Sequence, residues 1–469
     1  MIEVMQKAAF SKARKLAISL LPFKGDPRPG LEASPCIPVP ASGFEILDGP
    51  GAFRRKLMEL IAQARTRILL PVLYLQDDDA GREILEALYA AKAAHPVLQI
   101  EVFVDLHRAQ RGLIGKARSE GNAAMYREMA RRLGPGVPIH GIPVQTRELM
   151  GVMHLKGFVL DDQVLYSGAS FNDVYLHRHE RYRLDRYHLI RSRELADSLA
   201  TLLTQVILRD PAVQPLGGRS RTRMKPPRAV IASFRRHLKE ASCAFAAGTP
   251  HASEIGVTPL LGLGRRGNDL NATLLQVVEH ARQRLVLFTP YFNLPRPIHK
   301  AVRERLRAGC RVTIVLGDKT ANDFYIPPSE PFRAIGSLPY LYESNLRRFC
   351  KSQQHAIDQG LLDVHLWKHG NNTFHLKGLW ADGEYSVLTG NNLNPRAWWL
   401  DLENGLLVRD PQRLLERQYE RELETILRHA KRLTDHREIE TMADYPVPVQ
   451  RFLKKLTRPL LDRLINQIL

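Results

Sequence analysis

The chain has 469 residues, of which 44% are hydrophobic and 25% charged, a composition typical of soluble globular proteins and not of disordered or fibrous ones. Its 68 Lys and Arg residues exceed its 49 Asp and Glu residues, and the net charge of +19 predicts a polyanionic partner, either nucleic acid or an anionic membrane surface. Four scattered cysteines without a C-x-x-C pair exclude a disulfide framework and a cysteine zinc site, and no apolar run is long enough for a transmembrane helix.

The first 45 residues form an N-terminal amphipathic segment. Basic and apolar residues are interspersed up to Leu21, without the compact apolar stretch and cleavage site of a signal peptide. We therefore expect a cytoplasmic protein. This segment is either a helix packed on the core or a helix lying on a membrane surface.

Residues 46–210 and 256–430 follow one pattern, which predicts two similar halves. Each half starts with a helix, the sequence Ala-Arg-x-Arg and an apolar strand. A second helix and a second apolar strand follow in each half, and such alternation is typical of α/β layers. The predicted fold class is α/β, with two similar α/β/α halves around one central active site. The expected ranges are 53–75, 80–94 and 98–104 in the first half, and 270–292, 296–308 and 311–316 in the second.

A short motif, H-x-K-x-x-x-x-D, occurs once in each half. It runs from His154 and Lys156 to Asp161, and again from His375 and Lys377 to Asp382. At positions i and i+2 the imidazole and the ammonium project from the same face of an extended strand. Two such strands facing each other would surround one anionic group with two imidazoles and two cations. That arrangement suits phosphoryl transfer, with one nucleophilic histidine and one proton carrier, and it places the site between the halves.

Asp161 and Asp382 precede hairpin partner strands at 163–167 and 385–388. Although both complete the motif, we expect them to secure these turns more than to touch substrate. Small polar residues follow each hairpin and could bind phosphate oxygens through hydroxyls, amides and backbone N–H groups. The candidates are Ser170, Asn172, Asn392 and Asn394.

Further along, Asp185 and Glu403 occupy equivalent places in the two halves. A carboxylate hydrogen-bonded to Nδ1 of a histidine fixes the imidazole tautomer and leaves Nε2 free to attack. We expect these two carboxylates to orient the two histidines.

Two further segments are rich in basic residues. Residues 211–255 form a basic linker that is either solvated or placed on anionic lipid headgroups. Residues 431–469 form a C-terminal basic amphipathic tail, in which apolar residues recur at helical spacing from Val449 onward. This tail is either a helix packed on the core or an interfacial membrane helix.

The paired motifs resemble those of the phospholipase D superfamily. Within it, the segments GASFNDVYLH, LDRYHLIR, HRAQRG, GDKTANDFYIP and NNLNPRAWWLDLEN resemble the bacterial phosphatidylserine synthases, and the resemblance covers roughly residues 45–430. It implies two phospholipase D-like halves and a phosphohistidine intermediate, without a metal ion or other cofactor. The chain departs from the superfamily pattern at Gly168-Ala169, where a Gly-Ser pair is usual and the serine, Ser170, is displaced by one position.

The resemblance further implies transfer of the phosphatidyl group of CDP-diacylglycerol to L-serine with release of CMP. By superfamily habit, His154 would attack the phosphorus and His375 would take the proton of the serine hydroxyl, although the two roles could be exchanged. Four side chains would hold the phosphate oxygens: Lys156, Lys377, Asn172 and Asn394. Peripheral attachment to the inner face of the cell membrane follows from the lipid substrate.

Two loops after apolar strands hold further substrate-binding candidates, because strand ends in α/β layers collect ligand sites. The first set could equally be a structural salt-bridge cluster: His107, Arg108 and Arg111. The second set could bind cytidine, pyrophosphate or serine: Lys319, Asn322, Asp323 and Tyr325.

Three alternatives stay open at this point. A cardiolipin synthase or phospholipase of the same superfamily would use the same histidines with another acceptor. A nucleic-acid phosphodiesterase would also use the positive charge, but the basic residues accompany amphipathic helices and not stacking aromatics. A non-enzymatic scaffold is disfavoured by two intact motifs, whereas secondary binding to ribosomes or nucleic acid is compatible with the charge.

Overall fold

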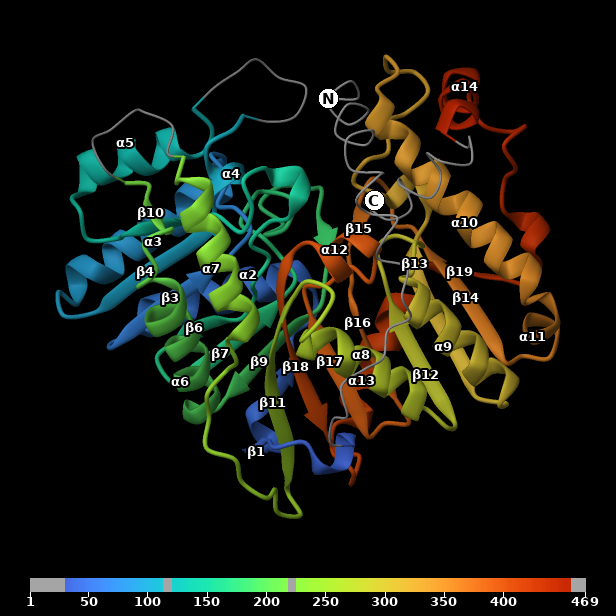
Figure 1. Ribbon diagram of the computed structural model, residues 1–469, viewed down its shortest axis with the longest axis horizontal. Coiled ribbons are helices and arrows are strands. Elements are labelled where there is room, and N and C mark those ends of the chain that lie inside the picture. The colour runs from blue at the N-terminus through green and yellow to red at the C-terminus, as the bar shows by residue number, and fades with distance from the viewer. Residues whose placement is uncertain (1–29, 113–119, 218–224, 457–469) are drawn as a thin grey trace.

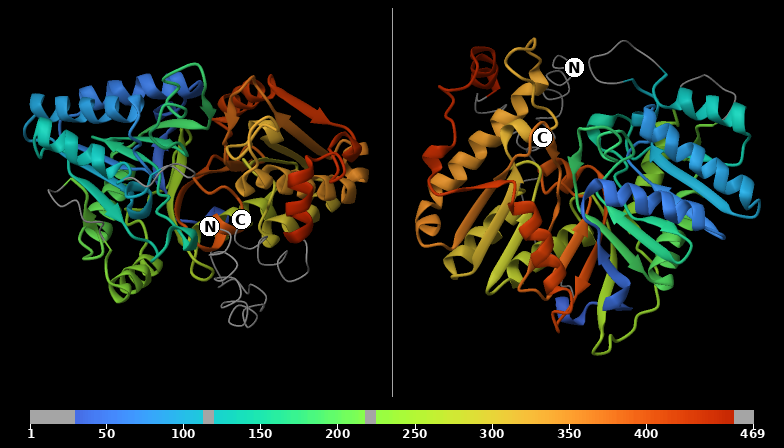
Figure 2. Two further views of the ribbon diagram at one scale, coloured as in Figure 1. Left: turned by 90° about the horizontal axis from the view of Figure 1, so that it is seen from above. Right: turned by 180° about the vertical axis from the view of Figure 1, so that it is seen from behind.

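Two β-sheets, one in each half of the chain, organise the protein and lie side by side (Figure 1). In this computed structural model, residues 30–112, 120–217 and 225–456 are described. Views from above and from behind show the same arrangement of two halves (Figure 2). The parts of the two terminal segments and of the basic linker that lie in 1–29, 218–224 and 457–469 fall outside the described residues.

The first half is built on an eight-stranded sheet in the order β10-β5-β4-β3-β6-β7-β9-β2. Helices α2 (Gly49–Gln63), α3 (Asp79–Ala94) and α5 (Ala123–Leu133) cover one face, and their apolar residues share a buried cluster with strand residues such as Ile100 and Val102. The strands are β2 (Phe44–Ile46), β3 (Arg67–Pro71), β4 (Gln99–Asp105), β5 (Ile139–Ile142), β6 (Phe158–Leu160), β7 (Gln163–Ser167), β9 (Tyr187–Arg191) and β10 (Gln214–Pro215).

The second half is built on a nine-stranded sheet in the order β1-β11-β18-β17-β16-β12-β13-β14-β19. Helices α8 (Asp269–His280), α9 (Arg296–Arg307) and α10 (Leu338–Ser352) share a buried cluster with its strands. The strands are β1 (Ile37–Pro40), β11 (Glu254–Leu263), β12 (Arg284–Phe288), β13 (Arg311–Gly317), β14 (Leu362–Trp367), β16 (Gly378–Ala381), β17 (Tyr385–Thr389), β18 (Leu402–Arg409) and β19 (Ala430–Leu433).

The two sheets repeat one topology. The order β5-β4-β3-β6-β7-β9-β2 in the first half corresponds to β14-β13-β12-β16-β17-β18-β11 in the second. In each, the first three strands are parallel and the others pair antiparallel. The predicted α/β fold with two similar halves is therefore confirmed, as are the predicted helices and apolar strands.

A third buried cluster lies between the sheets and joins the halves. It includes residues from both sheets and from helices α6 (Arg193–Thr201), α7 (Arg228–Glu240) and α13 (Glu416–Leu427). Helix α6 contacts β7 of its own half and β11 of the other, while α13 contacts β14 and β2. Burying one large side chain such as Phe234 contributes about 1.5–3 kcal/mol, so this cluster holds the halves in a fixed relation.

The histidines and lysines of the two motifs do not lie within regular strands, contrary to the sequence prediction. They lie in extended segments just before β6 and β16, because a glycine with positive φ follows each lysine: Gly157 at φ 91° and Gly378 at φ 109°. A Cβ at Gly378 would also lie 2.5 Å from the carbonyl oxygen of Val387, so only glycine fits there.

Several segments outside the predicted halves are also ordered elements. Strand β1 pairs with β11 of the second half, although it precedes the first half in sequence. The basic linker contains α7, whose Phe234 and Leu238 are buried, so this part is not simply solvated. In the C-terminal tail, α14 (Val447–Leu456) packs Val449 and Leu453 against Tyr340 and Tyr445.

The remaining short elements are β8 (Arg183–Leu184) and β15 (Thr373–Phe374), which form their own two-stranded sheet, and helices α4 (Leu106–Ala109), α11 (Gln354–Asp358) and α12 (Pro395–Trp399). Among the described residues, no helix has both the length and the apolar character needed to cross a bilayer.

Candidate active site

Each H-x-K segment is held by the backbone of the opposite half. The amide of His154 donates to the carbonyl oxygen of Leu402 at 2.8 Å, at the start of β18. The amide of His375 donates to the carbonyl oxygen of Leu184 at 2.8 Å, next to the parallel pair β8–β15. Both motifs therefore lie where the two halves meet.

Asn404 fixes the first motif with two hydrogen bonds. Its Oδ1 accepts from the Lys156 amide and its Nδ2 donates to the Lys156 carbonyl oxygen, each at 2.8 Å. Sequence reasoning missed this residue, because the equivalent position in the first half is Arg186, which instead forms a two-pronged ion pair with Glu422. The only available signal was its position directly after Glu403.

We expect Asn404→Ala to destabilise the protein by about 2–4 kcal/mol, because it leaves two buried backbone groups of Lys156 without partners. Thermal unfolding would show the loss as a lower Tm. Gln63→Ala is a suitable control, since it removes an amide whose hydrogen bond, to Glu59, is exposed. A Tm equal to that of the wild type would contradict the assigned role of Asn404.

His154 has a carboxylate on one ring nitrogen. Its Nδ1 is hydrogen-bonded to both oxygens of Glu403 at 2.9 Å, and both side chains are buried. Within the described residues, Nε2 of His154 has no hydrogen-bond partner. With Glu403 ionised, Nδ1 carries the proton and Nε2 offers its lone pair to a reacting group.

His375 has a different environment. Its Nδ1 is hydrogen-bonded to the hydroxyl of Tyr175 at 3.0 Å, whereas Oδ2 of Asp185 is 3.7 Å away. Asp185 instead binds Lys377, with 2.5 Å between Oδ2 and Nζ. The carboxylate of Asp323 lies 3.7 Å from Nε2 of His375. The two histidines, which are equivalent in sequence, are thus held by different partners.

The two lysines are buried, and glycines of the hairpin ends make room for them. A Cβ at Gly168 would lie 2.5 Å from Nζ of Lys377, and a Cβ at Gly390 would lie 2.8 Å from Cγ of Lys156. Lys156 donates to the carbonyl oxygen of Ala169 at 3.1 Å. The departure at Gly168-Ala169 therefore preserves the glycine, which is the residue that the packing needs.

The buried charges shift one another's protonation. Burial lowers the pKa of Lys156 to about 7, and Lys377 adds repulsion. Burial and the two lysines lower the pKa of His154 well below its usual range, and burial and Lys377 lower that of His375 to about 4. Burial raises the pKa of Glu403, so Glu403 and His154 share one proton across their hydrogen bond. The site holds neutral imidazoles beside cations, which suits nucleophilic attack on an anionic phosphate.

The two motif aspartates stabilise turns. Asp161 accepts hydrogen bonds from the backbone amides of Arg65, Thr66 and Arg67. Asp382 accepts from the equivalent amides of residues 282–284. These amides lie at the connections from α2 to β3 and from α8 to β12, and not in the hairpin turns that the sequence analysis expected the two aspartates to secure. Neither carboxylate contacts a motif histidine in these bonds.

The small polar candidates lie close behind the hairpins. Asn172 and Asn394 play matching parts, since their Oδ1 atoms accept from the amides of Tyr175 and Ala397, three residues on. Ser170 is buried, and Oδ1 of Asn392 is buried without a hydrogen-bond partner. Binding of phosphate oxygens by these four residues stays a prediction.

The loop candidates of the first half form a cluster of ion pairs. Arg111 binds Glu148 at 2.5 Å, Arg108 lies 3.4 Å from the same carboxylate, and Nε2 of His107 is hydrogen-bonded to the carbonyl oxygen of Gln145. These contacts match the salt-bridge cluster that was the structural alternative.

In the second half, Lys319 pairs with Glu343 and Glu440, Oδ1 of Asn322 accepts from the Phe324 amide, and Tyr325 packs near Tyr340. The residue of this loop that approaches a motif histidine is Asp323, whose Oδ2 lies 3.7 Å from Nε2 of His375. Asp323 was one of the four residues of this loop for which the sequence predicted binding of cytidine, pyrophosphate or serine.

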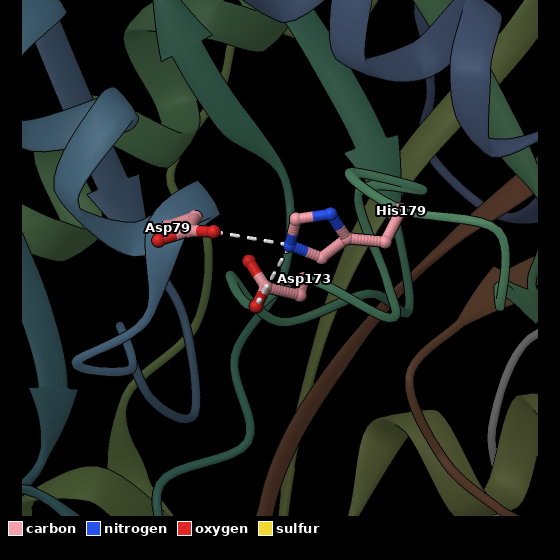
Figure 3. Close-up of side chains that lie close together, drawn as sticks. All are labelled: Asp79, Asp173 and His179. Carbon is pink, nitrogen blue, oxygen red and sulfur yellow. Dashed lines mark hydrogen bonds and ion pairs between the residues drawn. The ribbon is translucent and has the colours of Figure 1, made fainter.

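A group of possible metal ligands lies elsewhere on the first half. Nε2 of His179 sits between the carboxylates of Asp79 and Asp173, at 3.1 and 3.6 Å (Figure 3). Asp79 and His179 are exposed, and Asp173 also accepts from the Ala80 amide at the start of α3. The ion pairs and the helix cap account for this group without a metal ion.

Comparison with known proteins shows which proteins the chain is similar to. Residues 274–427 match the family model described as "Cardiolipin synthase, PLD-like domain". The chain is 49% identical to the CDP-diacylglycerol–serine O-phosphatidyltransferase of Escherichia coli (strain K12), over 90% of this chain and 93% of the relative. It is 46% identical to the enzyme of the same name from Haemophilus influenzae, over 93% and 96%. The crystal structure of the Haemophilus influenzae phosphatidylserine synthase matches with a TM-score of 0.89 and 43% identity, over 98% of this chain and all of that one.

The duplicated α/β fold and the paired H-x-K segments define a phospholipase D-like phosphatidyltransferase. The chain belongs to the CDP-diacylglycerol–serine O-phosphatidyltransferase family, the phosphatidylserine synthases.

Proposed function

We propose that this phosphatidyltransferase moves the phosphatidyl group of CDP-diacylglycerol to L-serine in two steps, through a phosphatidyl-histidine. The observation that carries the proposal is the hydrogen bond of Glu403 to Nδ1 of His154, beside two buried lysines. It leaves Nε2 of one histidine as a free nucleophile, and the lysines supply charge for the phosphate oxygens.

In the first step, Nε2 of His154 attacks the phosphorus that bears the diacylglycerol. The N–P bond forms while the P–O bond to CMP breaks, and CMP leaves with the electron pair. Nδ1–H of His154 then belongs to a cationic phosphoimidazole, which the Glu403 carboxylate stabilises at 2.9 Å. Lys156 and Lys377 offset the charge on the nonbridging oxygens.

In the second step, the serine hydroxyl attacks the same phosphorus. Nε2 of His375 takes the hydroxyl proton, while Nδ1 stays hydrogen-bonded to Tyr175. The new O–P bond forms and the N–P bond breaks, so the electron pair returns to Nε2 of His154. The products are phosphatidylserine and CMP, and the enzyme is restored once the His375 imidazolium releases its proton to water.

Purified protein incubated with CDP-diacylglycerol in detergent tests the proposal. We expect CMP release to depend on L-serine, and phosphatidylserine to form in equal amount. CMP release that glycerol or phosphatidylglycerol stimulates, and serine does not, would indicate another phosphatidyltransferase of the superfamily.

The pKa values of Lys156 and His375 predict the pH dependence of kcat/KM. Lys156 must keep its proton, which it loses as the pH rises through about 7, and His375 must be neutral, which it ceases to be as the pH falls through about 4. We therefore expect kcat/KM for CDP-diacylglycerol to be greatest between these values and to fall above pH 7. Lys156→Arg should abolish the alkaline fall, since arginine stays charged. An alkaline limb that is identical in the two enzymes would contradict this assignment.

We further propose that the protein binds the anionic cytoplasmic face of the membrane through a surface that comprises the loop around Phe332 and helix α14. Phe332 and Val447 are exposed to 43% and 55%, and the Phe332 ring lies 6.1 Å from that of Phe452. The helix also carries exposed Arg451 and Lys455. Apolar side chains beside basic ones suit an anionic bilayer surface.

Replacing both Phe332 and Val447 by serine should lower activity on anionic vesicles by roughly tenfold, with little change on detergent-dispersed substrate. Val97→Ser is the matched control, because Val97 is 89% exposed but follows helix α3 in the other half. Flotation with vesicles measures binding directly. Equal activity of the double variant and the wild type on vesicles would exclude this surface.

A further inference from the structure

Two partly buried residues of opposite charge lie near His375 and have no part in the two steps above. Asp323 follows β13 in the second half, and Arg183 lies on β8 in the first. Their side chains are 13% and 15% exposed, and the Arg183 Nε atom lies 3.3 Å from Oδ1 of Asp323. The other carboxylate oxygen, Oδ2, is 3.7 Å from Nε2 of His375. The Asp323 carboxylate therefore lies beside the ring nitrogen that is to receive the serine proton, and Arg183 lies beside that carboxylate.

Aromatic neighbours hold the two charges in place. The Arg183 guanidinium lies over the Tyr175 ring, 4.7 Å from its centroid, and its Nε donates to the Thr373 hydroxyl at 3.2 Å. The Tyr291 hydroxyl donates to Oδ2 of Asp323 at 3.3 Å. Tyr175 itself is hydrogen-bonded to His375. The charges are thus positioned before any ligand arrives.

The pair is incompletely satisfied as an ion pair. Oδ1 of Asp323 is buried and accepts no hydrogen bond within the described residues, although Arg183 lies beside it. A buried carboxylate oxygen without a donor is costly and calls for an explanation. An ion pair built only for stability would align donor and acceptor, whereas a ligand donor would satisfy this oxygen.

At the corresponding place beside His154 the charges are exchanged, and both oxygens of the carboxylate have donors. Asp401 precedes Glu403 by two residues, as Arg183 precedes Asp185. Its Oδ1 accepts from the Val152 amide at 2.9 Å, and its Oδ2 binds Arg396 at 3.2 Å. The unsatisfied pair is therefore a feature of the His375 side alone, where the acceptor alcohol must bind.

We infer that Asp323 and Arg183 form the subsite for the zwitterionic head of an α-amino acid acceptor. Oδ1 of Asp323 accepts from the ammonium group, Arg183 donates to the carboxylate, and the side-chain hydroxyl of the acceptor reaches Nε2 of His375. A small β-hydroxy amino acid spans these groups, whereas an alcohol with one charge leaves one of them unmatched. The inference rests on the proposed function and adds the residues that select serine.

The test combines two variants with two serine analogues. Ethanolamine keeps the ammonium group and the hydroxyl, and 3-hydroxypropionate keeps the carboxylate and the hydroxyl. For the wild type we expect each analogue to compete with labelled L-serine about 10- to 100-fold more weakly than unlabelled L-serine does. Asp323→Asn should raise the KM for L-serine by the same factor and abolish the competition by ethanolamine, but not that by 3-hydroxypropionate. Arg183→Gln should show the reverse pattern.

A fall in kcat without a rise in the KM for L-serine, in either variant, would show that the pair only positions His375 and would overturn the inference. If a variant does not fold, the wild-type competition decides, because analogues that compete as well as L-serine would exclude the subsite. A wild-type enzyme that forms no phosphatidylserine would instead contradict the proposed function. The two failures are therefore distinguishable.

Discussion

His154→Ala should release no burst of CMP from CDP-diacylglycerol and should lose overall activity by about 10⁴-fold or more, the effect typical of removing a catalytic nucleophile. The reason is the environment of the ring. Glu403 occupies Nδ1 and leaves Nε2 open, next to Lys156 and Lys377. No comparable carboxylate contacts Nδ1 of His375, where Asp185 is 3.7 Å away and bound to Lys377.

His375→Ala should behave differently. The leaving group of the first step is the phosphate of CMP, which departs without a proton, whereas the serine hydroxyl of the second step needs a base. This variant should therefore release about one CMP per enzyme and then stall. Rapid-quench measurement of CMP distinguishes the two variants. A burst in His154→Ala that is missing in His375→Ala would exchange the two roles.

Glu403→Gln should lower kcat by about 10³- to 10⁴-fold while the protein stays folded, because an amide can hold the imidazole in the wrong tautomer and cannot stabilise the cationic phosphoimidazole. The matched control is Glu420→Gln, since Glu420 forms a partly exposed ion pair with Arg284 and does not contact the histidines. Steady-state CMP release and thermal unfolding together measure the effect.

A kcat for Glu403→Gln within about threefold of the wild type would contradict the assignment of His154 as the oriented nucleophile. Loss of activity together with a lower Tm would point to a role in folding, since Glu403 lies on β18, between β11 and β17 within the second sheet.

Local periodicity was sufficient to predict the halves. Apolar strands such as β4 and amphipathic helices such as α3 depend mainly on nearby residues, so their order could be predicted from the chain. The same order occurs in both halves, which gave two independent observations of it. The expectation that the histidines lie on regular strands was wrong, because positive φ at Gly157 and Gly378 ends the regular pairing. The sequence around these two glycines does not distinguish them from glycines that lie within a regular strand.

Contacts between the halves could not be predicted from the chain. Duplication implies equal surroundings for both histidines, yet Tyr175 and Asp323 contact His375 alone, while Glu403 contacts His154. Glu403 of the second half is hydrogen-bonded to His154 of the first, and Asp185 of the first half binds Lys377 of the second, so each pairing joins residues nearly two hundred or more positions apart. Asn404 was missed for the same reason, since its partner is the backbone of Lys156 in the other half.

The central claim is that His154 carries the phosphatidyl group. The most direct measurement is to stall His375→Ala with CDP-diacylglycerol labelled in the diacylglycerol-linked phosphate, digest the protein under alkaline conditions and locate the label by peptide mass spectrometry. The account predicts label on the peptide that contains His154. Addition of L-serine should release this label from an enzyme with an intact His375 and should not release it from His375→Ala. Label on the peptide that contains His375 in a His154→Ala enzyme, together with no label on the peptide that contains His154 in the His375→Ala enzyme, would contradict it.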